Sequence, residues 1–367
     1  MIQGQSRITE FRSIDMTYYY ITKQRSNEKH AGGKAPNDID SLCAKRGWQR
    51  LAYPDTKKNK HLFYKRAYRS LLIRLFWIRQ SLSMKPDSFV LYQHPMRSGA
   101  RIAQKHIKEL QEKKNIKFAV LIHDIDSIRY DRVEDGVLFE DNVLLKQFDA
   151  FICHNEHMKK YLIEQGIPAD HIICLQVFDY LVDNDNVRDS DDGFVVAGNL
   201  DKNKCKYVYD LASVSPDIKV YAYGVNYEDD NKTNNMSYQG IYAPDELPSA
   251  LLGRFGIIWD GDSIDSCSGS FGNYMKYNNP HKLSLYIAAG KPVICWKQAA
   301  IADFVLEHKI GIAVESLNEA VDIVKTLNDS SYCEMKSNVM GIREKVITGY
   351  YFNRAADQIL ELLKIEE

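Results

Sequence analysis

Short apolar segments alternate with helical segments along most of this chain, and this alternation restricts the possible fold more than any other feature. Strand-length apolar runs occur at residues 16–21, 89–93, 118–122, 148–154, 172–177, 194–197, 218–223, 255–259 and 292–296. Helices are predicted at about 37–46, 99–113, 156–165, 316–327 and 350–364. Strands separated by helices indicate parallel sheets joined by right-handed crossovers. We therefore expect an α/β fold.

The chain is long enough for two domains. Its 367 residues exceed what a single core usually supports. The acidic, Asn-rich segment 179–193 lies between two series of strands and predicts an interdomain linker. Residues 1–15 are expected to form a loose extension. Two Rossmann-like halves that face each other across a cleft are the predicted architecture.

The composition indicates a globular protein of a reducing compartment. No apolar run approaches the roughly 20 residues that cross a bilayer, and the N-terminus has no signal-peptide pattern. The seven cysteines include no C-x-x-C pair, which argues against a disulfide framework or a zinc site. These features predict a cytoplasmic protein.

Residues 41–85 form a strongly basic segment. It contains twelve Lys or Arg and one acid, Asp55, together with apolar side chains such as Leu71 and Trp77. Basic and aromatic residues on one helix are typical of a surface that contacts anionic lipid. The same pattern also suits a solvated basic face whose apolar stripe packs on the core. Nucleic acid is not expected as a partner, because no recognition motif accompanies the patch.

The segment 255–294 contains the strongest candidate ligand site. A predicted strand leads into a polar loop, and a helix then begins at Asn279-Pro280-His281-Lys282. A helix N-terminus favours an anion, and Lys282 adds a positive charge there. The sequence therefore predicts a site for the diphosphate of a nucleotide sugar.

Other polar residues follow the carboxyl ends of predicted strands, where open parallel sheets bind ligands. The turn at Gly198 lets backbone amides approach an anion closely, and Lys202 or Lys204 could add a charge. Gly224 follows the next strand in the same way. Gly32 and Gly33 either shape an acceptor pocket or form a turn.

Two Asp-x-Asp triplets, at 124–126 and 260–262, also follow predicted strands. Such a triplet holds a divalent metal in another class of sugar transferase, but neither has a further ligand at suitable spacing. We expect no metal and no other cofactor. Asp126, then Asp124 or His123, are the candidate general bases, since a base must reach the acceptor hydroxyl. At least one of the three is expected to bind backbone amides instead.

Several runs of the sequence resemble bacterial galactofuranosyltransferases of O-antigen or capsule assembly. They are LIHDID at 121–126, VFDYLV at 177–182, AGNLDKNKC at 197–205, GVNYE at 224–228 and the long run at 257–286. More distantly, the chain from Met16 onward is similar to a streptococcal glucosyltransferase that extends sugars on a serine-rich adhesin. The resemblance implies a GT-B fold. Residues 1–183 plus 350–367 would form the acceptor-binding domain, and 184–349 the nucleotide-sugar-binding domain.

The resemblance also implies a reaction and a set of site residues. Galactofuranose would move from UDP-galactofuranose to a sugar hydroxyl of a cell-surface glycan precursor, with inversion and without a required metal. The implied donor-binding residues are Gly198, Asn199, Lys204, Tyr223, Gly224, Asp260, Asp262, Ser268, Gly269, Asn279, His281 and Lys282. The streptococcal relative lacks the Cys-Ser-Gly-Ser-Phe-Gly run, so this loop is expected to set the donor sugar.

Three alternative functions stay open from the sequence. The donor could be UDP-glucose or another UDP-pyranose, the enzyme could be a UDP-sugar 2-epimerase, or the chain could be a non-catalytic partner that binds a glycan or a transferase. A lipid-linked acceptor would place the protein peripherally on the inner face of the cytoplasmic membrane. Relatives of this kind self-associate, so a homo-oligomer is also considered, although no interface is identified.

Overall fold

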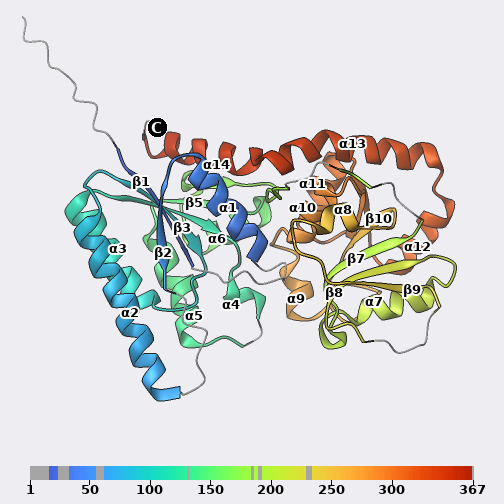
Figure 1. Cartoon of the computed structure of the whole chain (residues 1–367), viewed down its shortest axis with the longest axis horizontal. Coiled ribbons are helices and arrows are strands. Elements are labelled where there is room, and N and C mark those ends of the chain that lie inside the picture. The colour runs from blue at the N-terminus through green and yellow to red at the C-terminus, as the bar shows by residue number, and fades with distance from the viewer. Residues whose placement is uncertain are drawn as a thin grey trace, which may run out of the picture.

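The chain forms two parallel six-stranded sheets flanked by helices (Figure 1). The computed structural model describes residues 16–23, 33–54, 62–130, 132–182, 186–188, 192–228 and 234–365, without the side chains at 62, 63, 65, 66, 203 and 204. The predicted α/β fold with two parallel sheets is confirmed. Within these ranges, no helix combines the length and the apolar character needed to cross a membrane.

The first sheet has the strand order β2-β1-β3-β4-β5-β6. Its strands are β1 (Tyr18–Lys23), β2 (Gln49–Tyr53), β3 (Phe89–His94), β4 (Lys117–Ile122), β5 (Ala150–Cys153) and β6 (Ile172–Cys174). Its helices are α1 (Lys34–Lys45), α2 (Leu62–Ser83), α3 (Ala100–Lys114), α4 (Asp126–Arg129), α5 (Asp135–Phe139) and α6 (Glu156–Glu164), with a π-helical turn at Glu140–Leu144.

Both faces of the first sheet are covered, because alternate residues of a strand point to opposite faces. On β4, Phe118 and Val120 pack into the core under α2 and α3, whereas Ala119 and Leu121 pack into the core under α1 and the C-terminal helix. A strand buried on both faces reads as a continuous apolar run, which is why the sequence predicted β4 well.

The second sheet has the order β12-β11-β10-β7-β8-β9. Its strands are β7 (Phe194–Asn199), β8 (Val220–Val225), β9 (Met236–Gly240), β10 (Phe255–Ile258), β11 (Val293–Trp296) and β12 (Gly311–Val314). The helices between and after them are α7 (Lys202–Val214), α8 (Leu247–Ala250), α9 (Gly269–Tyr274), α10 (His281–Ala288), α11 (Ile301–Glu307), α12 (Leu317–Thr326) and α13 (Asp329–Thr348).

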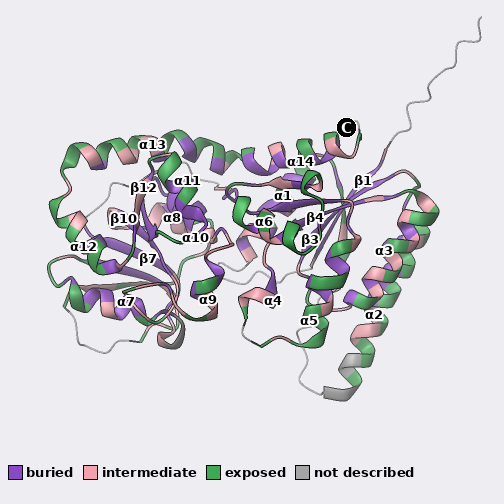
Figure 2. Ribbon diagram, turned by 180° about the vertical axis from the view of Figure 1, so that it is seen from behind, coloured by how far each residue is buried: buried purple, intermediate pink, exposed green. Residues whose placement is uncertain are grey.

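The last two helices join the two halves along one side of the molecule (Figures 1 and 2). On α13, Arg343 Nε donates to the carbonyl oxygen of Ala288 in the second half at 2.8 Å. Helix α14 (Tyr350–Leu362) then packs on α1, β5 and β6 of the first half. The Asp179 carboxylate accepts the amides of Tyr351 at 3.1 Å and Phe352 at 2.7 Å, and so holds the first turn of α14.

Three strands and several helices were not predicted from the sequence. The strands β2, β9 and β12 all lie at edges of the sheets, and the longest of these helices are α7, α11 and α13. Edge strands are partly exposed, so they lack the continuous apolar run that marks a central strand. The predicted strand at 172–177 is also shorter than expected, because β6 ends at Cys174. The polar loop after β10 contains a short helix, α9, that was not predicted.

Candidate active site between the two sheets

Strands β7 and β8 pair at Gly198 and Gly224, near the carboxyl end of each strand. Both glycines have positive φ angles, +145° and +134°. A Cβ atom at Gly224 would lie 1.7 Å from the carbonyl oxygen of Gly198, so the two strand ends can meet only without a side chain there. This close approach leaves a backbone-lined surface at the carboxyl edge of the second sheet.

Replacing Gly224 by alanine is expected to destabilise the protein by about 3 kcal/mol, because backbone strain and a backbone clash combine. Gly240→Ala is the matched control, since Gly240 also has a positive φ but has no atom within 4 Å of its Cβ position. The control is expected to lose only about 1 kcal/mol. Urea unfolding of both variants measures the difference, and equal losses would contradict the close approach.

Lys282 lies beside the Gly198 turn at the start of α10. Its Cε atom is 3.6 Å from the Cβ position of Gly198, and its Nζ donates to the carbonyl oxygen of Trp259 at 3.0 Å. The Asp260 carboxylate is 3.8 Å from Nζ. Burial alone would lower the pKa of Lys282, but Asp260 together with Tyr286, Cys205 and Cys267 outweighs it, so the pKa is raised. The structure thus brings a protonated amine, a helix N-terminus and a glycine turn together.

The loop after β10 folds back on itself between Asp260 and α9. Asp262 accepts a hydrogen bond from the Ser268 hydroxyl at 2.5 Å, which lowers the pKa of this exposed carboxyl group. A Cβ atom at Gly261 would lie 2.8 Å from the amide nitrogen of Ser268, so the turn is tight. Gly269 follows as the first residue of α9. The second Asp-x-Asp triplet and Ser268 therefore form one compact turn near Lys282.

Three other predicted donor residues have different surroundings. Asn199 is exposed, and its side-chain oxygen accepts from Asn226 Nδ2 at 2.9 Å. Tyr223 is buried, and its hydroxyl donates to the Ala250 carbonyl at 3.0 Å, so only its backbone is left for contact with a nucleotide. Lys204 belongs to α7, but its side chain lies outside the described part of the structure.

Asn279 and His281 connect the two halves. The Asn279 amide group donates to the carbonyl oxygens of His154 at 2.9 Å and Gln176 at 2.6 Å, both in the first half. His281 stacks on Tyr180 at 5.0 Å, and burial lowers its pKa to about 4, so its ring is neutral. These contacts hold the start of α10 against the first half, and contact of the two residues with a donor stays a prediction.

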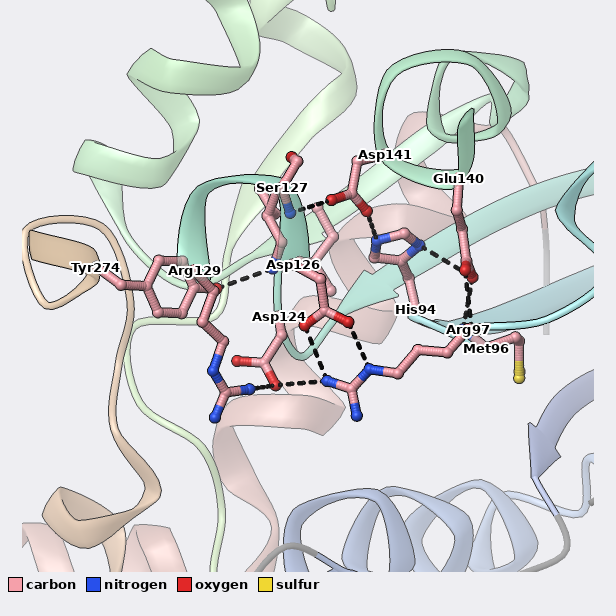
Figure 3. A network of polar contacts seen from close by, with 12 residues as sticks. His94, Met96, Arg97, Asp124, Asp126, Ser127, Arg129, Glu140, Asp141 and Tyr274 are labelled. Carbon is pink, nitrogen blue, oxygen red and sulfur yellow. Dashed lines mark hydrogen bonds and ion pairs between the residues drawn. The ribbon is translucent and has the colours of Figure 1, made fainter. Parts of the chain in front are cut away.

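The first Asp-x-Asp triplet lies after β4 and is held by two arginines (Figure 3). Arg97 binds Asp126 through two nitrogens, with its Nη2 at 2.9 Å from Oδ1. Arg129 forms an ion pair with Asp124, and Arg97 Nη2 is also 3.6 Å from Asp124. The Asp126 side chain is 3% exposed, whereas that of Asp124 is 23% exposed. Only Asp124 is therefore open enough to reach a bound ligand.

Asp124 also has the protonation behaviour of a general base. Burial raises its pKa to about 6, although the charges of Arg129 and Arg97 act in the opposite direction. A base is most effective when its pKa is near the working pH. His123 is engaged elsewhere, because its Nε2 is 2.7 Å from Gln93 Oε1 and its ring stacks on Phe178 at 5.5 Å. Among the three candidates, the geometry favours Asp124.

A buried network behind the triplet was missed in the sequence. His94 Nε2 is 2.9 Å from Asp141, and Asp141 accepts the Ser127 amide at 2.7 Å (Figure 3). Glu140 accepts the amides of Met96 at 2.6 Å and Arg97 at 2.8 Å. Burial alone would lower the pKa of His94, but the two carboxylates outweigh it and raise the pKa.

This network fixes the backbone that carries Arg97 and Asp126. The sequence does contain a signal for it, because His94 ends β3 at the same sheet edge as Asp124.

Helix α9 of the second half reaches across to the first triplet. The amide of Ile125 donates to the Tyr274 hydroxyl at 2.9 Å (Figure 3). Phe271 packs edge-on against Tyr130 at 5.6 Å, and the Arg129 guanidinium lies 5.9 Å from the Phe271 ring. The loop that carries Asp262 and Ser268 is thus joined to the arginine that holds Asp124. Helix α9 therefore links the donor-side loop of the second half to the carboxylate segment of the first half.

Of the two predicted acceptor residues, the structure describes one. Gly32 is outside the described residues, and Gly33 directly precedes α1. The next residue, Lys34, bridges the halves, because its Nζ is 2.8 Å from Asp38 and 2.5 Å from Asp245. Gly33 is therefore near the boundary between the halves. In the described ranges, no three His, Cys, Asp or Glu side chains are grouped as metal ligands.

Two family models together match most of the chain. The Glucosyltransferase 3-like N-terminal domain matches residues 18–177, and the Glucosyltransferase 3-like C-terminal domain matches residues 194–359. The beta-1,6-galactofuranosyltransferase WbbI of Escherichia coli (strain K12) is 37% identical over 255 residues, which are 68% of this chain and 73% of that protein. Glucosyltransferase 3 of Streptococcus gordonii is 25% identical over 337 residues, or 90% and 94% of the two chains.

The fold also matches solved structures. Sucrose-phosphate synthase from Thermosynechococcus elongatus has a TM-score of 0.63 at 12% identity, and the match covers 95% of this chain and 98% of that one. Such low identity shows the fold alone, and it is the GT-B fold. The predicted GT-B fold and the resemblance to galactofuranosyltransferases are both confirmed.

Proposed function

The chain belongs to the glucosyltransferase 3-like family of glycosyltransferases, and on that premise we propose that it transfers galactofuranose from UDP-galactofuranose. The acceptor in this proposal is a sugar hydroxyl of a cell-surface glycan precursor, as in O-antigen or capsule assembly. The reaction inverts the anomeric carbon and requires no metal. The observation that supports the donor is the 37% identity to WbbI, which is named a galactofuranosyltransferase.

Lys282 and the N-terminus of α10 would hold the diphosphate of the donor. An ammonium group and a helix N-terminus both favour negative charge, and they act most strongly where water is partly excluded. The Lys282 side chain is 22% exposed, so its amine is partly desolvated yet accessible. These groups would stabilise the charge that develops on departing UDP, which is the role a metal has in other transferases.

Asp124 would act as the general base. In an inverting transfer, the acceptor oxygen forms a bond to the anomeric carbon while the bond from that carbon to the UDP oxygen breaks. The acceptor proton moves to the Asp124 carboxylate, and UDP leaves with the electron pair. Arg129 and Arg97 would orient the carboxylate from either side. The raised pKa of Asp124 lets it accept a proton more readily than an ordinary aspartate.

The loop that ends in α9 would select the donor sugar. It carries Asp262 and Ser268 on the donor side, and its Phe271 and Tyr274 contact the segment that contains Asp124. A sugar placed between Lys282 and Asp124 would therefore have this loop as a neighbour. The composition of the loop, rather than the two sheets, would distinguish a furanose from a pyranose.

Donor choice is tested by product formation from UDP-galactofuranose, UDP-galactopyranose and UDP-glucose with a panel of glucosyl and galactosyl acceptors. We expect hexose transfer, detected by mass spectrometry, from the furanose donor alone, and we expect the rate to be unchanged by a chelator such as EDTA. Transfer only from UDP-glucose would show that the enzyme is a glucosyltransferase and that the proposed furanose donor is wrong. Release of UDP or an altered sugar without an acceptor would indicate an epimerase.

The precursor that carries the acceptor sugar is proposed to be lipid-linked. Such a substrate lies at the inner face of the cytoplasmic membrane, so the enzyme would work as a peripheral protein there. Homo-oligomer formation is compatible with this arrangement.

A further inference from the structure

Helix α2 has two apolar faces, and the sheet covers only one of them. Toward the core, Ile73 and Trp77 are buried, Phe76 packs against Tyr53 at 5.2 Å, and Trp77 stacks on His106 at 6.0 Å. These contacts fix the orientation of the helix. The apolar stripe expected to pack on the core is therefore present.

The opposite face carries a second apolar stripe that is exposed. Five residues form it, with exposed fractions from 48% to 79%: Tyr68, Leu71, Leu75, Ile78 and Leu82. They recur every three or four residues, so they lie along one line of the helix over about 20 Å. We call these five residues the α2 stripe. A contiguous apolar surface of this kind on a folded protein usually marks an interaction site.

The α2 stripe is flanked only by positive charge. Helix α2 contains five Lys or Arg and no Asp or Glu. Of these, Arg74 and Arg79 are exposed on either side of the stripe. In Figure 1 the helix lies at the outer edge of the first half, on the side away from the second half, and Figure 2 shows its exposed face. A partner can therefore reach it without covering the site between the sheets.

The charges decide between a second copy of the chain and a lipid surface. The spacing of the α2 stripe would suit a two-stranded coiled coil, in which the residues beside the seam face their counterparts on the partner. Arg74 and Arg79 occupy two of those positions, and a parallel pair in register would place Arg74 opposite Arg79 of the second copy. In an antiparallel pair neither arginine would meet a carboxylate on the partner helix, because α2 contains no Asp or Glu. Anionic headgroups, in contrast, would meet the arginines while the stripe enters the acyl boundary.

We propose that the α2 stripe with Arg74 and Arg79 is a docking surface for an anionic lipid bilayer. The helix lies in the plane of the membrane surface, with the stripe inserted and the arginines among the headgroups. The proposal rests on the proposed function for its purpose, because a lipid-linked acceptor lies at a membrane. The docking itself needs neither donor nor acceptor.

Flotation with vesicles tests the docking directly. The full chain is expected to float with vesicles of phosphatidylcholine and phosphatidylglycerol in equal parts, and not with phosphatidylcholine alone. Arg74→Glu with Arg79→Glu is expected to weaken binding on the order of tenfold or more, since each basic residue near an anionic surface contributes measurably. Leu75→Glu with Ile78→Glu is expected to abolish it. Absence of wild-type binding overturns the proposal.

The matched control reverses two charges elsewhere. Lys309 and Lys325 are exposed in the second half, and Lys309→Glu with Lys325→Glu is expected to leave vesicle binding unchanged. If the control loses as much vesicle binding as the Arg74→Glu, Arg79→Glu variant, the net charge of the protein explains the effect, and α2 is not the docking surface. Arg69 is left intact in all variants because it is only partly exposed.

Two further measurements separate this proposal from its competitors. Sedimentation velocity reports self-association: a wild-type dimer that the Leu75→Glu, Ile78→Glu variant dissociates would assign the stripe to a second copy and overturn lipid docking. The rate of transfer to a water-soluble acceptor measures the active site independently of a membrane. Both α2 variants are expected to keep the wild-type rate, which would also show that they are folded. If the wild type binds vesicles but transfers no sugar, the proposed function is wrong and the α2 stripe is still a lipid-docking surface.

Discussion

The Lys282→Ala variant is expected to turn over on the order of a hundredfold to a thousandfold more slowly than the wild type, with its fold retained. Lys282 Nζ is held at 3.0 Å from the Trp259 carbonyl, beside the Gly198 turn, so it is in place before the donor binds. Removing one preorganised group that stabilises developing charge costs roughly 2.7–4 kcal/mol. Because that charge develops in the transition state, the loss is expected in kcat more than in KM.

Two controls identify the source of the effect. Lys282→Ala removes the amine and also leaves the Asp260 carboxylate without its cation. The double variant Lys282→Ala, Asp260→Asn removes both charges, so any loss of activity that it keeps is due to the missing amine. Lys276 is the matched lysine, since it belongs to the same segment but lies over the Trp296 ring at 5.5 Å. Lys276→Ala is expected to keep most of the activity. Wild-type turnover in Lys282→Ala would mean that the donor binds elsewhere.

The Asp124→Asn variant is expected to lose on the order of a hundredfold to ten-thousandfold in kcat, because it removes the proposed general base. Its stability is expected not to fall. A folded pKa that is raised to about 6 means that the fold favours the protonated carboxyl group, so a neutral amide costs little. Steady-state rates and urea unfolding at neutral pH check the two halves of this prediction.

The raised pKa of Asp124 also predicts how activity and stability depend on pH. In the wild type, kcat/KM is expected to rise as pH increases through about 6, as Asp124 becomes ionised, and this rise is expected to be missing in Asp124→Asn. For stability the sign is opposite. The contribution of Asp124 is fully present below its unfolded pKa and is lost as pH rises through about 6, because the folded protein binds the proton more tightly.

Asp126→Asn provides the contrast. Asp126 is buried and binds Arg97 through two nitrogens, so its loss leaves an arginine with half its partner charge. Removing one partner of a fully buried ion pair costs roughly 3–5 kcal/mol. Here the Arg97 side chain is 42% exposed, so solvent screens the pair and the expected loss is smaller, although this variant is still expected to unfold more easily than the wild type. If Asp126→Asn instead stays stable and loses activity while Asp124→Asn keeps its rate, the base is Asp126.

The central strands could be read from the sequence, whereas of the four edge strands only β6 could. Phe118–Ile122 is buried on both faces within β4, so its apolar run shows in one dimension. The edge strand β2 has three exposed residues, Gln49, Arg50 and Ala52, and carries no such run. Its pairing with β1 depends on the neighbouring strand rather than on its own composition. The spacing of apolar residues along a strand reflects which of its faces are buried, and an edge strand is the least buried strand of a sheet.

The candidate site was only partly visible in the sequence. Lys282 was recognised because its charge and the helix start are adjacent in the chain. The ranking of Asp126 ahead of Asp124 is not what the structure favours, because it depends on Arg97, which lies 29 residues from Asp126 along the chain. Asn279 and His281 stood next to Lys282 in sequence, yet the structure turns them toward His154, Gln176 and Tyr180 in the first half.

The sequence by itself determined the α/β class, the two parallel sheets and the helix start beside Lys282, because the spacing of apolar residues, the composition and the helix-start signals are local. Only the tertiary structure decided which carboxylate is open, which face of α2 stays exposed and which helix joins the halves. Burial and ion pairing depend on groups distant in the chain, such as Arg97 with Asp126 or Tyr274 with Ile125. The first contact exists only after the first sheet has formed, and the second only after the two halves are placed against each other.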